Sequence, residues 1–379
     1  MIRKILGFIF MNLKNAIGWK TQRKIVVFSV DDYGNVRVNS KKALDNMKAA
    51  GMKSYSRFDA LDTLETKQDL EQLFEVLSSV KDKNQRSAVF TPFALPCNID
   101  FEKMESEDFQ QFHFETLPVT YQKLAVQQPE AYQGAWDLWQ AGIEKGYLKP
   151  QFHGREHLNL HIFNDKLQKR DTELLTALKN KSYTSISDDD YPTMSSTAAF
   201  DFWDVKENET LAPMIEEGLE LFEKVYGYKS NYCTPPVYNI HHSLFGTLKK
   251  NGVEFIDLGL VRKEHQGFNQ YKTSINYTGK STKEGLSIIV RNVVFEPTED
   301  RDIDWVAFTM KQIETAFRWN KPAIISSHRV NFCGHIDPEN RKKGLETLQR
   351  LLHEIVKKWP EVEFMAVDEM VETLKNKRK

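Results

Sequence analysis

The chain has 379 residues, a formal net charge of -1 and 40% hydrophobic residues. This length suits one large globular domain or two smaller ones, and the near-neutral charge argues against a dedicated nucleic-acid binder. Its three cysteines, Cys97, Cys233 and Cys333, are widely spaced, which excludes a disulfide framework and a thiolate zinc site. Unpaired cysteines favour a reducing compartment, so we expect a cytoplasmic protein.

Residues 1–23 form an N-terminal segment whose apolar residues recur at the spacing of an amphipathic helix: Ile2, Ile5, Leu6, Ile9, Leu13 and Ile17. The apolar run 5–11 is far too short to span a bilayer, and no clear signal-peptide cleavage site follows it. We expect this helix to pack on the domain or on a partner. Peripheral contact of residues 1–20 with a membrane, or a signal peptide, is the alternative.

The domain expected over residues 24–379 begins with the apolar, β-branched run 25–30, which predicts a strand buried on both faces. Asp31 and Asp32 follow at its C-terminal end, where α/β barrels place their chemistry. Two adjacent carboxylates are costly to bury unless a cation or a proton compensates them. The rest of the chain is therefore expected to supply a compensating group.

Strand and helix patterns then alternate along the chain. Further strands are expected at 52–58, 87–95, 147–153, 230–237, 252–257, 287–295, 323–328 and 362–367. Helices are expected at 39–49, 67–80, 134–146, 165–180, 211–226, 244–251, 305–319 and 345–359. Residues 97–133 and 188–203 are expected to be insertions, and residues 262–285 a polar loop. The alternation predicts an α/β fold, a distorted (β/α) barrel of about seven parallel strands with inserted loops.

Two histidines four apart, His153 and His157, would share one side of a helical turn. With one carboxylate they make a three-ligand set with open positions, which suits catalytic Zn²⁺ or another divalent metal such as iron. The metal would compensate one aspartate and leave the other free as a base. His328 ends an apolar strand and would point into the same barrel mouth. Taken singly, each histidine is explained as well by a surface, capping or core role.

The turn 234–238 contains Pro235 and Pro236, and the backbone N–H groups that follow could face a substrate oxyanion. An ordinary rigid turn is the alternative. The remaining candidate ligands are more often solvated or structural: His161, His241, His242, His335 and the triplet Asp188, Asp189 and Asp190.

Four of these pieces, in this order, resemble motifs of the polysaccharide deacetylase family (carbohydrate esterase family 4 and its relatives, among them the chitooligosaccharide deacetylases). They are the strand ending in Asp31 and Asp32, the pair His153 and His157, the Pro-Pro turn within 232–238, and the strand ending in His328. The resemblance spans about residues 24–372. It implies a metal-dependent hydrolase that removes acetyl groups, foremost N-acetyl, from a carbohydrate or polysaccharide precursor.

The resemblance also implies a role for each matching residue. Asp31 would be the general base and His328 the general acid. Asp32, His153 and His157 would be the metal ligands, with Zn²⁺ the expected ion. The backbone N–H of Val237 or Tyr238 would lie in the oxyanion hole.

One departure concerns an arginine that orients the base in that family. The matching place is occupied here by Cys233 and Thr234, and Arg155 or Arg329 is considered as the replacement. The missing arginine favours a first alternative, a catalytically degenerate barrel that binds carbohydrate. A second alternative is a metal-free glycoside hydrolase that uses two carboxylates.

Overall fold

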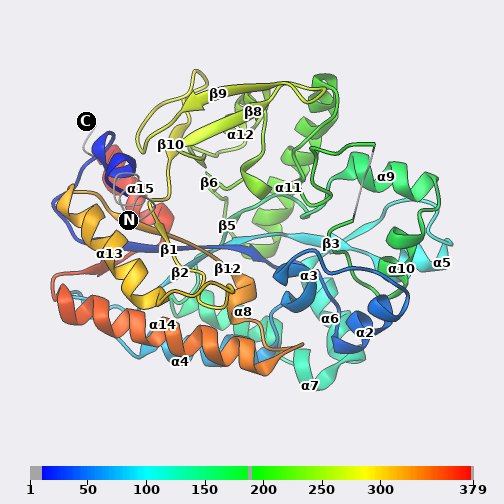
Figure 1. The fold of residues 1–379 in the computed structure, drawn as a ribbon, viewed down its shortest axis with the longest axis horizontal. Helices are drawn as coiled ribbons and strands as arrows, with labels where there is room; N and C mark the ends of the chain where they lie inside the picture. The colour runs from blue at the N-terminus through cyan, green and yellow to red at the C-terminus, as the bar shows by residue number, and fades with distance from the viewer. Residues whose placement is uncertain (1–10, 187–189, 377–379) are drawn as a thin grey trace.

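The computed structural model describes residues 11–186 and 190–376. One curled sheet runs through the middle of the molecule, with helices on both sides (Figure 1). Its strands are β1 (Ile25–Tyr33), β2 (Phe90–Ala94), β5 (Gln151–Phe152), β6 (Tyr232–Cys233), β7 (Phe255–Asp257), β10 (Ser287–Ile289), β11 (Val293–Val294), β12 (Ala323–His328) and β13 (Glu363–Phe364).

The strand order is β10-β7-β6-β5-β2-β1-β12-β11, and β13 pairs with the start of β1. All ladders of this sheet are parallel. The predicted barrel-like α/β fold is confirmed as a half-barrel, with eight strands along the path where about seven were expected.

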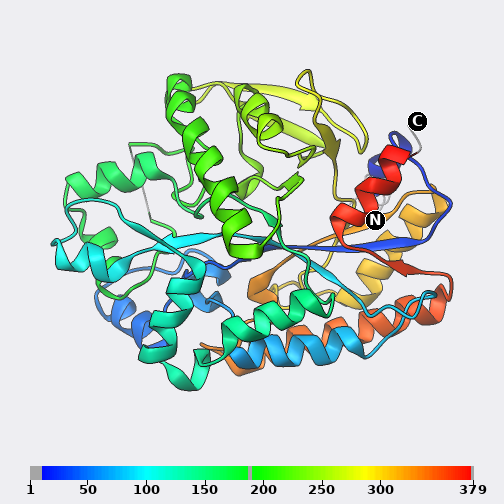
Figure 2. The same cartoon turned by 180° about the vertical axis from the view of Figure 1, so that it is seen from behind.

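The helices in chain order are α2 (Lys41–Ala49), α3 (Arg57–Leu61), α4 (Lys67–Ser78), α5 (Phe101–Ser106), α6 (Leu117–Gln127), α7 (Pro129–Tyr132), α8 (Ala135–Glu144), α9 (Leu160–Gln168), α10 (Thr172–Lys179), α11 (Asn208–Tyr226), α12 (Phe245–Lys250), α13 (Trp305–Arg318), α14 (Pro338–Lys358) and α15 (Val367–Asn376). Helices α4, α8 and α14 lie on one side of the sheet and α11 and α12 on the other, as both views show (Figure 1, Figure 2). Each side of the sheet is therefore covered.

Strand β1 lies in the middle of this sheet, and all nine of its residues are buried. It pairs with β2 on one edge and with β12 on the other, so an unbroken apolar run is what the position requires. Because neighbouring strands are parallel, their carboxyl ends meet at one edge of the sheet. There Asp31 of β1 lies in register with His328 of β12.

Several local predictions were wrong. The expected strand 52–58 is absent, and α3 begins at Arg57 instead. The insertion 97–133 is ordered: it holds α5, α6, α7 and a hairpin of β3 (Cys97–Ile99) with β4 (Phe114–Thr116). The polar loop 262–285 contains most of a second antiparallel hairpin, β8 (Val261–His265) with β9 (Tyr271–Ile275). Both hairpins lie outside the main sheet, so the strand–helix alternation did not reveal them.

Two expected elements are divided. The helix 165–180 becomes α9 and α10, because Arg170 has a positive φ of 53° and the Asp171 side chain caps α10. The strand 287–295 becomes β10 and β11, separated by Val290, Arg291 and Asn292. The Asn292 side chain donates to the Pro322 carbonyl at 2.9 Å, and the Arg291 side chain bonds two buried carboxylates.

The structure describes only part of the predicted N-terminal helix. Residues 1–10 lie outside the described residues, and residues 11–16 are helical, with Leu13 57% exposed. Across 11–186 and 190–376, no helix has the length and apolar character needed to cross a membrane. The three cysteines are buried and unpaired, as expected. The division at residue 24, the cytoplasmic location and the membrane contact of residues 1–20 stay predictions.

Candidate active site

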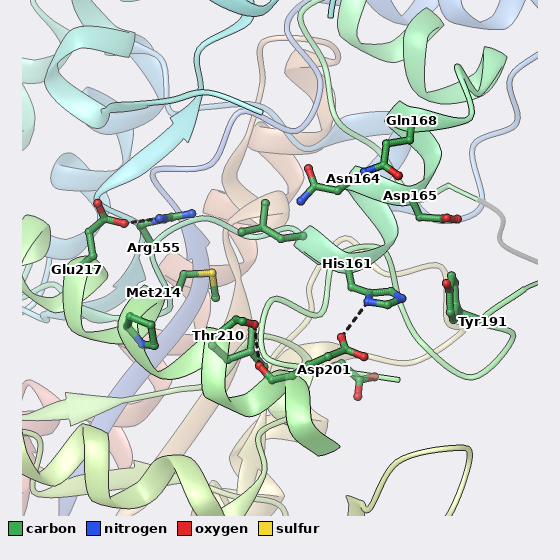
Figure 3. A pocket seen from close by; sticks show the side chains of 14 residues that line it. Arg155, His161, Asn164, Asp165, Gln168, Tyr191, Asp201, Thr210, Met214 and Glu217 are labelled. Atoms are coloured by element: carbon green, nitrogen blue, oxygen red, sulfur yellow. Dashed lines mark hydrogen bonds and ion pairs between the residues drawn. The ribbon is translucent and has the colours of Figure 1, made fainter. Parts of the chain in front are cut away.

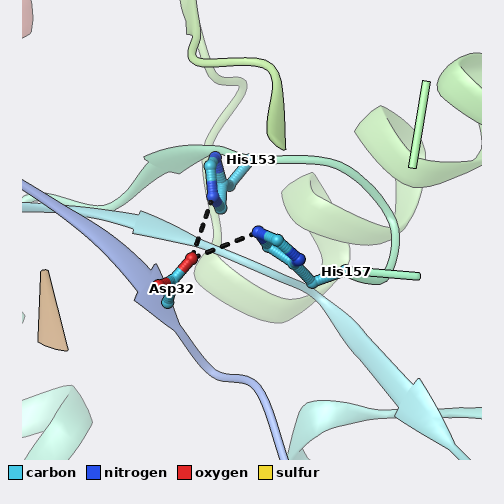
Figure 4. Close-up of side chains that lie close together, drawn as sticks. All are labelled: Asp32, His153 and His157. Atoms are coloured by element: carbon cyan, nitrogen blue, oxygen red, sulfur yellow. Dashed lines mark ion pairs between the residues drawn. The ribbon is translucent and has the colours of Figure 1, made fainter. Parts of the chain in front are cut away.

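Three of the predicted residues converge where the strands end (Figure 4). Asp32 comes from the end of β1, and His153 and His157 come from the loop after β5. The Nε2 atoms of His153 and His157 lie 3.5 and 3.2 Å from Oδ1 of Asp32. One ligand atom from each residue lies within 4.8 Å of the others, and all three residues are buried. This spacing lets one ion contact all three.

The protonation of His153 fits a metal ligand. Its Nδ1 lies 2.7 Å from the carbonyl oxygen of Thr234, which can only accept, so Nδ1 carries the proton and a neutral ring leaves a lone pair on Nε2. That Nε2 is buried and has no hydrogen-bond partner among the described residues. A buried lone pair beside a carboxylate is costly unless a cation occupies the space between them. The three residues therefore fit a divalent metal.

A local irregularity brings both aspartates to the same cavity. In a regular strand Asp31 and Asp32 would point to opposite faces. Here the register between β1 and β2 shifts between Val30 and Tyr33, and Asp32 has a φ of 75°. This conformation is uncommon for a residue other than glycine, and such residues cluster at functional sites. Both aspartates consequently line one cavity of about 410 Å³.

The surroundings of Asp32 and His157 favour the forms that bind a metal. Burial alone would raise the pKa of the Asp32 carboxyl, but the adjacent rings of His153 and His157 outweigh it and hold that pKa well below its ordinary value. Burial lowers the pKa of His157, although the charge of Asp32 opposes the shift. An ionised carboxylate and a neutral imidazole are the forms that bind a divalent ion.

Asp31 is held by an arginine that the sequence did not single out. Nη1 and Nη2 of Arg291 donate to the two carboxylate oxygens of Asp31 at 2.7 and 2.8 Å. Nε of Arg291 donates to Asp257 at 2.7 Å. Asp257 also accepts from the hydroxyls of Thr234 and Tyr232, both at 2.8 Å. This network of five residues fixes the orientation of the Asp31 carboxylate.

The prediction that Arg155 or Arg329 orients Asp31 is wrong. Arg155 pairs with Glu156 and Glu217, and Arg329 pairs with Asp62 and Glu65. The cation that pairs with Asp31 is Arg291. The signal for Arg291 was present, because this cation interrupts the otherwise apolar run 287–295.

His328 lines the same cavity. Its Nε2 is 3.8 Å from Oδ2 of Asp31, and its Nδ1 is 2.7 Å from Oε1 of Glu296. Burial would lower the pKa of His328, but the charge and hydrogen bond of Glu296 raise it to about 9. The other oxygen of Glu296 accepts from Asn331 and Arg57, which hold it in place. His328 is thus protonated at neutral pH.

The Pro-Pro turn also lines the cavity. Val237 and Tyr238, which follow the two prolines, have φ values of 57° and 56°. The N–H of Tyr238 donates to the Pro235 carbonyl at 2.9 Å and is therefore occupied. The N–H of Val237 has no acceptor within the described part of the chain, and Val237 lines the cavity. Of the two predicted oxyanion donors, Val237 is the one left available.

The remaining candidates lie elsewhere. His161 pairs with Glu207 at 2.9 Å and lines a different cavity. His241 and His242 group with Glu264, and His335 contacts Gln128 at 2.8 Å. Asp188 and Asp189 lie outside the described residues, and Asp190 pairs with Lys169. None of the described ones lines the cavity of Asp31 and Asp32.

These observations define a class of site: an Asp-His-His set for a divalent ion, flanked by an ion-paired aspartate and a protonated histidine, at the carboxyl edge of an α/β half-barrel. No protein-family model matches the chain, and no curated protein matches it in sequence.

Solved structures with a similar fold include polysaccharide deacetylases and carbohydrate-active enzymes of other kinds. A Mycobacterium smegmatis protein assigned as a polysaccharide deacetylase has 11% identity, covering 96% of this chain and 94% of its own, with a TM-score of 0.47. The peptidoglycan deacetylase PdaC from Bacillus subtilis has 10% identity, covers 94% of this chain and 94% of its own, and has a TM-score of 0.35. The 4-alpha-glucanotransferase from Thermococcus litoralis has 11% identity, covers 92% of this chain and 40% of its own, and has a TM-score of 0.45. These values are too low to carry an argument about function, which rests on the site itself.

Proposed function

We propose that this protein is a metal-dependent hydrolase that removes acetyl groups, foremost N-acetyl groups, from a carbohydrate or a polysaccharide precursor. The observation that carries the proposal is the arrangement around one cavity: the set Asp32, His153 and His157, with Asp31 and His328 beside it. Zn²⁺ is the proposed ion, because two imidazoles and one carboxylate with open positions suit it.

When bound by Asp32, His153 and His157, the ion would polarise an acetyl carbonyl and lower the pKa of a water molecule towards about 7. Asp31 is the proposed base that accepts a proton from the attacking water. Arg291 binds both oxygens of Asp31, so it sets which lone pair faces the cavity. This role of Arg291 is one of positioning.

His328 is the proposed acid that donates its proton to the departing amine. Its raised pKa, about 9, keeps the proton available at neutral pH. The N–H of Val237 is the proposed backbone donor to the oxyanion that develops on the acetyl oxygen. Asp31, His328 and Val237 all line the cavity, so one bound acetamido group could contact all three residues.

The two alternatives have less support. The degenerate-barrel hypothesis rested on a missing arginine, and Arg291 now supplies that cation to Asp31. A metal-free glycoside hydrolase needs one carboxyl group that stays protonated as an acid. Among the described residues, the carboxyl groups that line the cavity are Asp31, bound by an arginine, and Asp32, whose pKa is held low by two histidines.

The test is to measure zinc content and acetate release from acetylated amino sugars in the wild type, Asp32→Ala and His157→Ala. We expect one Zn²⁺ per chain and acetate release in the wild type, and loss of both in the variants. His161→Ala is a matched control, because this histidine lies four residues beyond His157 but lines the other cavity. Acetate release that survives complete removal of metal would overturn the proposal.

A further inference from the structure

A second and larger cavity, of about 890 Å³, lies between α9 and α11 (Figure 3). Its volume is within the range of about 300–1,000 Å³ that small-ligand sites occupy. In the close-up the side chains of Asn164, Asp165 and Gln168 extend from α9, with Tyr191 beside them and Met214 on α11. No site residue considered above, other than His161 and Arg155, lines it.

The loop that carries the metal ligands separates the two cavities. His153 and His157 line the smaller cavity, whereas Arg155, which stands between them in the chain, lines the larger one. Arg155 pairs there with Glu217 on α11. The loop 153–157 therefore contributes to the walls of both cavities.

Carboxylates outnumber cations around the larger cavity. Four of its lining residues carry a carboxylate: Asp165, Asp201, Glu207 and Glu217. Among the described lining residues, Arg155 is the one with a permanent positive charge, and it also pairs with Glu156, which is buried. Two of the carboxylates have a histidine partner: Glu207 pairs with His161, and Asp201 with His265. Lys169 contacts Asp165 from outside, but it pairs with Asp190 as well. The described charges consequently favour a cationic ligand and disfavour an anionic one.

The uncharged part of the lining suits a sugar. Asn164 and Gln168 present amides on the exposed side of α9, and their side chains make no hydrogen bond with a described residue. Leu211 and Met214 supply an apolar surface on α11. At the rim, the Tyr191 ring packs against that of Trp203 at 5.3 Å. Amides bind hydroxyl groups, and apolar and aromatic surfaces pack against the C–H face of a sugar ring.

We propose that this second cavity binds a cationic amino-sugar unit, the de-N-acetylated form of the polymer that the neighbouring site acts on. The proposal rests on the proposed function for the identity of the sugar, and on the charge and lining of the cavity for the preference for a free ammonium group. Such a site would hold the deacetylated part of a chain while the next acetylated unit occupies the smaller cavity.

The test is calorimetric titration of the full-length Asp32→Ala variant, which cannot turn the ligand over, with a glucosamine tetramer. We expect binding in this background, and a dissociation constant raised about tenfold or more when Asp165→Asn and Glu217→Gln are added. Glu216→Gln is the matched control, because Glu216 is next to Glu217 on α11 but contacts Lys250 instead. This control should bind the tetramer as tightly as the Asp32→Ala background. Circular dichroism and the melting temperature verify that each variant is folded.

Two comparison ligands complete the test. The N-acetylglucosamine tetramer should bind at least about tenfold more weakly than the glucosamine tetramer, and a galacturonic acid tetramer should bind more weakly still. Equal affinity for the acetylated and free tetramers, or equal affinity of the Glu216→Gln and the Asp165→Asn, Glu217→Gln proteins, overturns the proposal. Because no step of the assay requires acetate release, a failure of the proposed function is seen separately, in the activity and zinc measurements on the wild type.

Discussion

Arg291 binds both carboxylate oxygens of Asp31, a residue 260 positions earlier in the chain, at 2.7 and 2.8 Å. Both residues are buried, and Asp257 accepts a hydrogen bond from the Nε–H of the guanidinium. Arg291 therefore compensates the charge of one of the two adjacent aspartates. Asp31 is compensated by Arg291, and Asp32 by two histidines that fit a metal ion.

The orientation that Arg291 gives to Asp31 is testable with Arg291→Lys. Lysine keeps the positive charge but cannot donate two parallel hydrogen bonds, so we expect kcat to fall about 100-fold while zinc content is unchanged. Arg301→Lys is the control, because Arg301 is a surface arginine paired with Glu299. A lysine variant of Arg291 with full activity would show that Asp31 needs only the charge.

The proton on His328 predicts a pH dependence. The protonated form is required, so activity should fall as the pH rises through the pKa of His328, at or below about 9, since a bound cation nearby would lower it. Glu296→Gln removes the charge that raises this pKa. The alkaline limb of kcat/KM should then move to lower pH by about one unit or more. If the alkaline limb of kcat/KM does not move in this variant, a group other than His328 titrates in that pH range.

The acid role of His328 predicts a difference between substrates. An amine leaving group needs a proton more than an alcohol does, so His328→Ala should impair N-deacetylation more than O-deacetylation. The measurement is kcat for an N-acetylated and an O-acetylated sugar, with wild type and variant side by side. Equal loss on both substrates would contradict this role.

Metal binding should stabilise the fold, because the ligands come from β1 and from the loop after β5 and meet only in the folded chain. Zn²⁺ at a hundredfold excess over its dissociation constant would add about 2.7 kcal/mol to the free energy of unfolding. Chelation should therefore lower the melting temperature of the wild type. The same treatment should leave the melting temperature of Asp32→Ala unchanged, and an equal drop in both proteins would place the stabilising ion elsewhere.

Arg329 should matter for stability and not for catalysis. It is 1% exposed and pairs with Asp62 and Glu65. Arg329→Met leaves two buried carboxylates unpaired, which should cost about 3–5 kcal/mol of the free energy of unfolding. Denaturant titration measures this, and kcat per folded molecule should stay near that of wild type. Arg350→Met, an exposed position on α14, should have little effect on either quantity.

The sequence was sufficient where a local pattern reports burial. Strand β1 was predicted because a run of β-branched residues suits only a strand covered on both faces, and all of its residues are buried. The three candidate metal ligands were predicted because a carboxylate at a strand end and an H-x-x-x-H pair are short patterns with a chemical meaning, and the structure brings the three residues together. The hairpin β8–β9 was missed because its exposed, polar residues resemble a loop.

The sequence by itself determined that strands and helices alternate along the chain, and it determined which residues are able to carry the chemistry. Both follow from side chains that are close together in the chain. Only the tertiary structure decided which charges compensate one another. Arg291 reaches Asp31 and Glu296 reaches His328 because parallel strands bring their carboxyl ends to one edge, whatever the separation of those strands in the chain. The register shift in β1 that brings both aspartates to one cavity likewise depends on pairing with β2, which the residues of β1 do not encode alone.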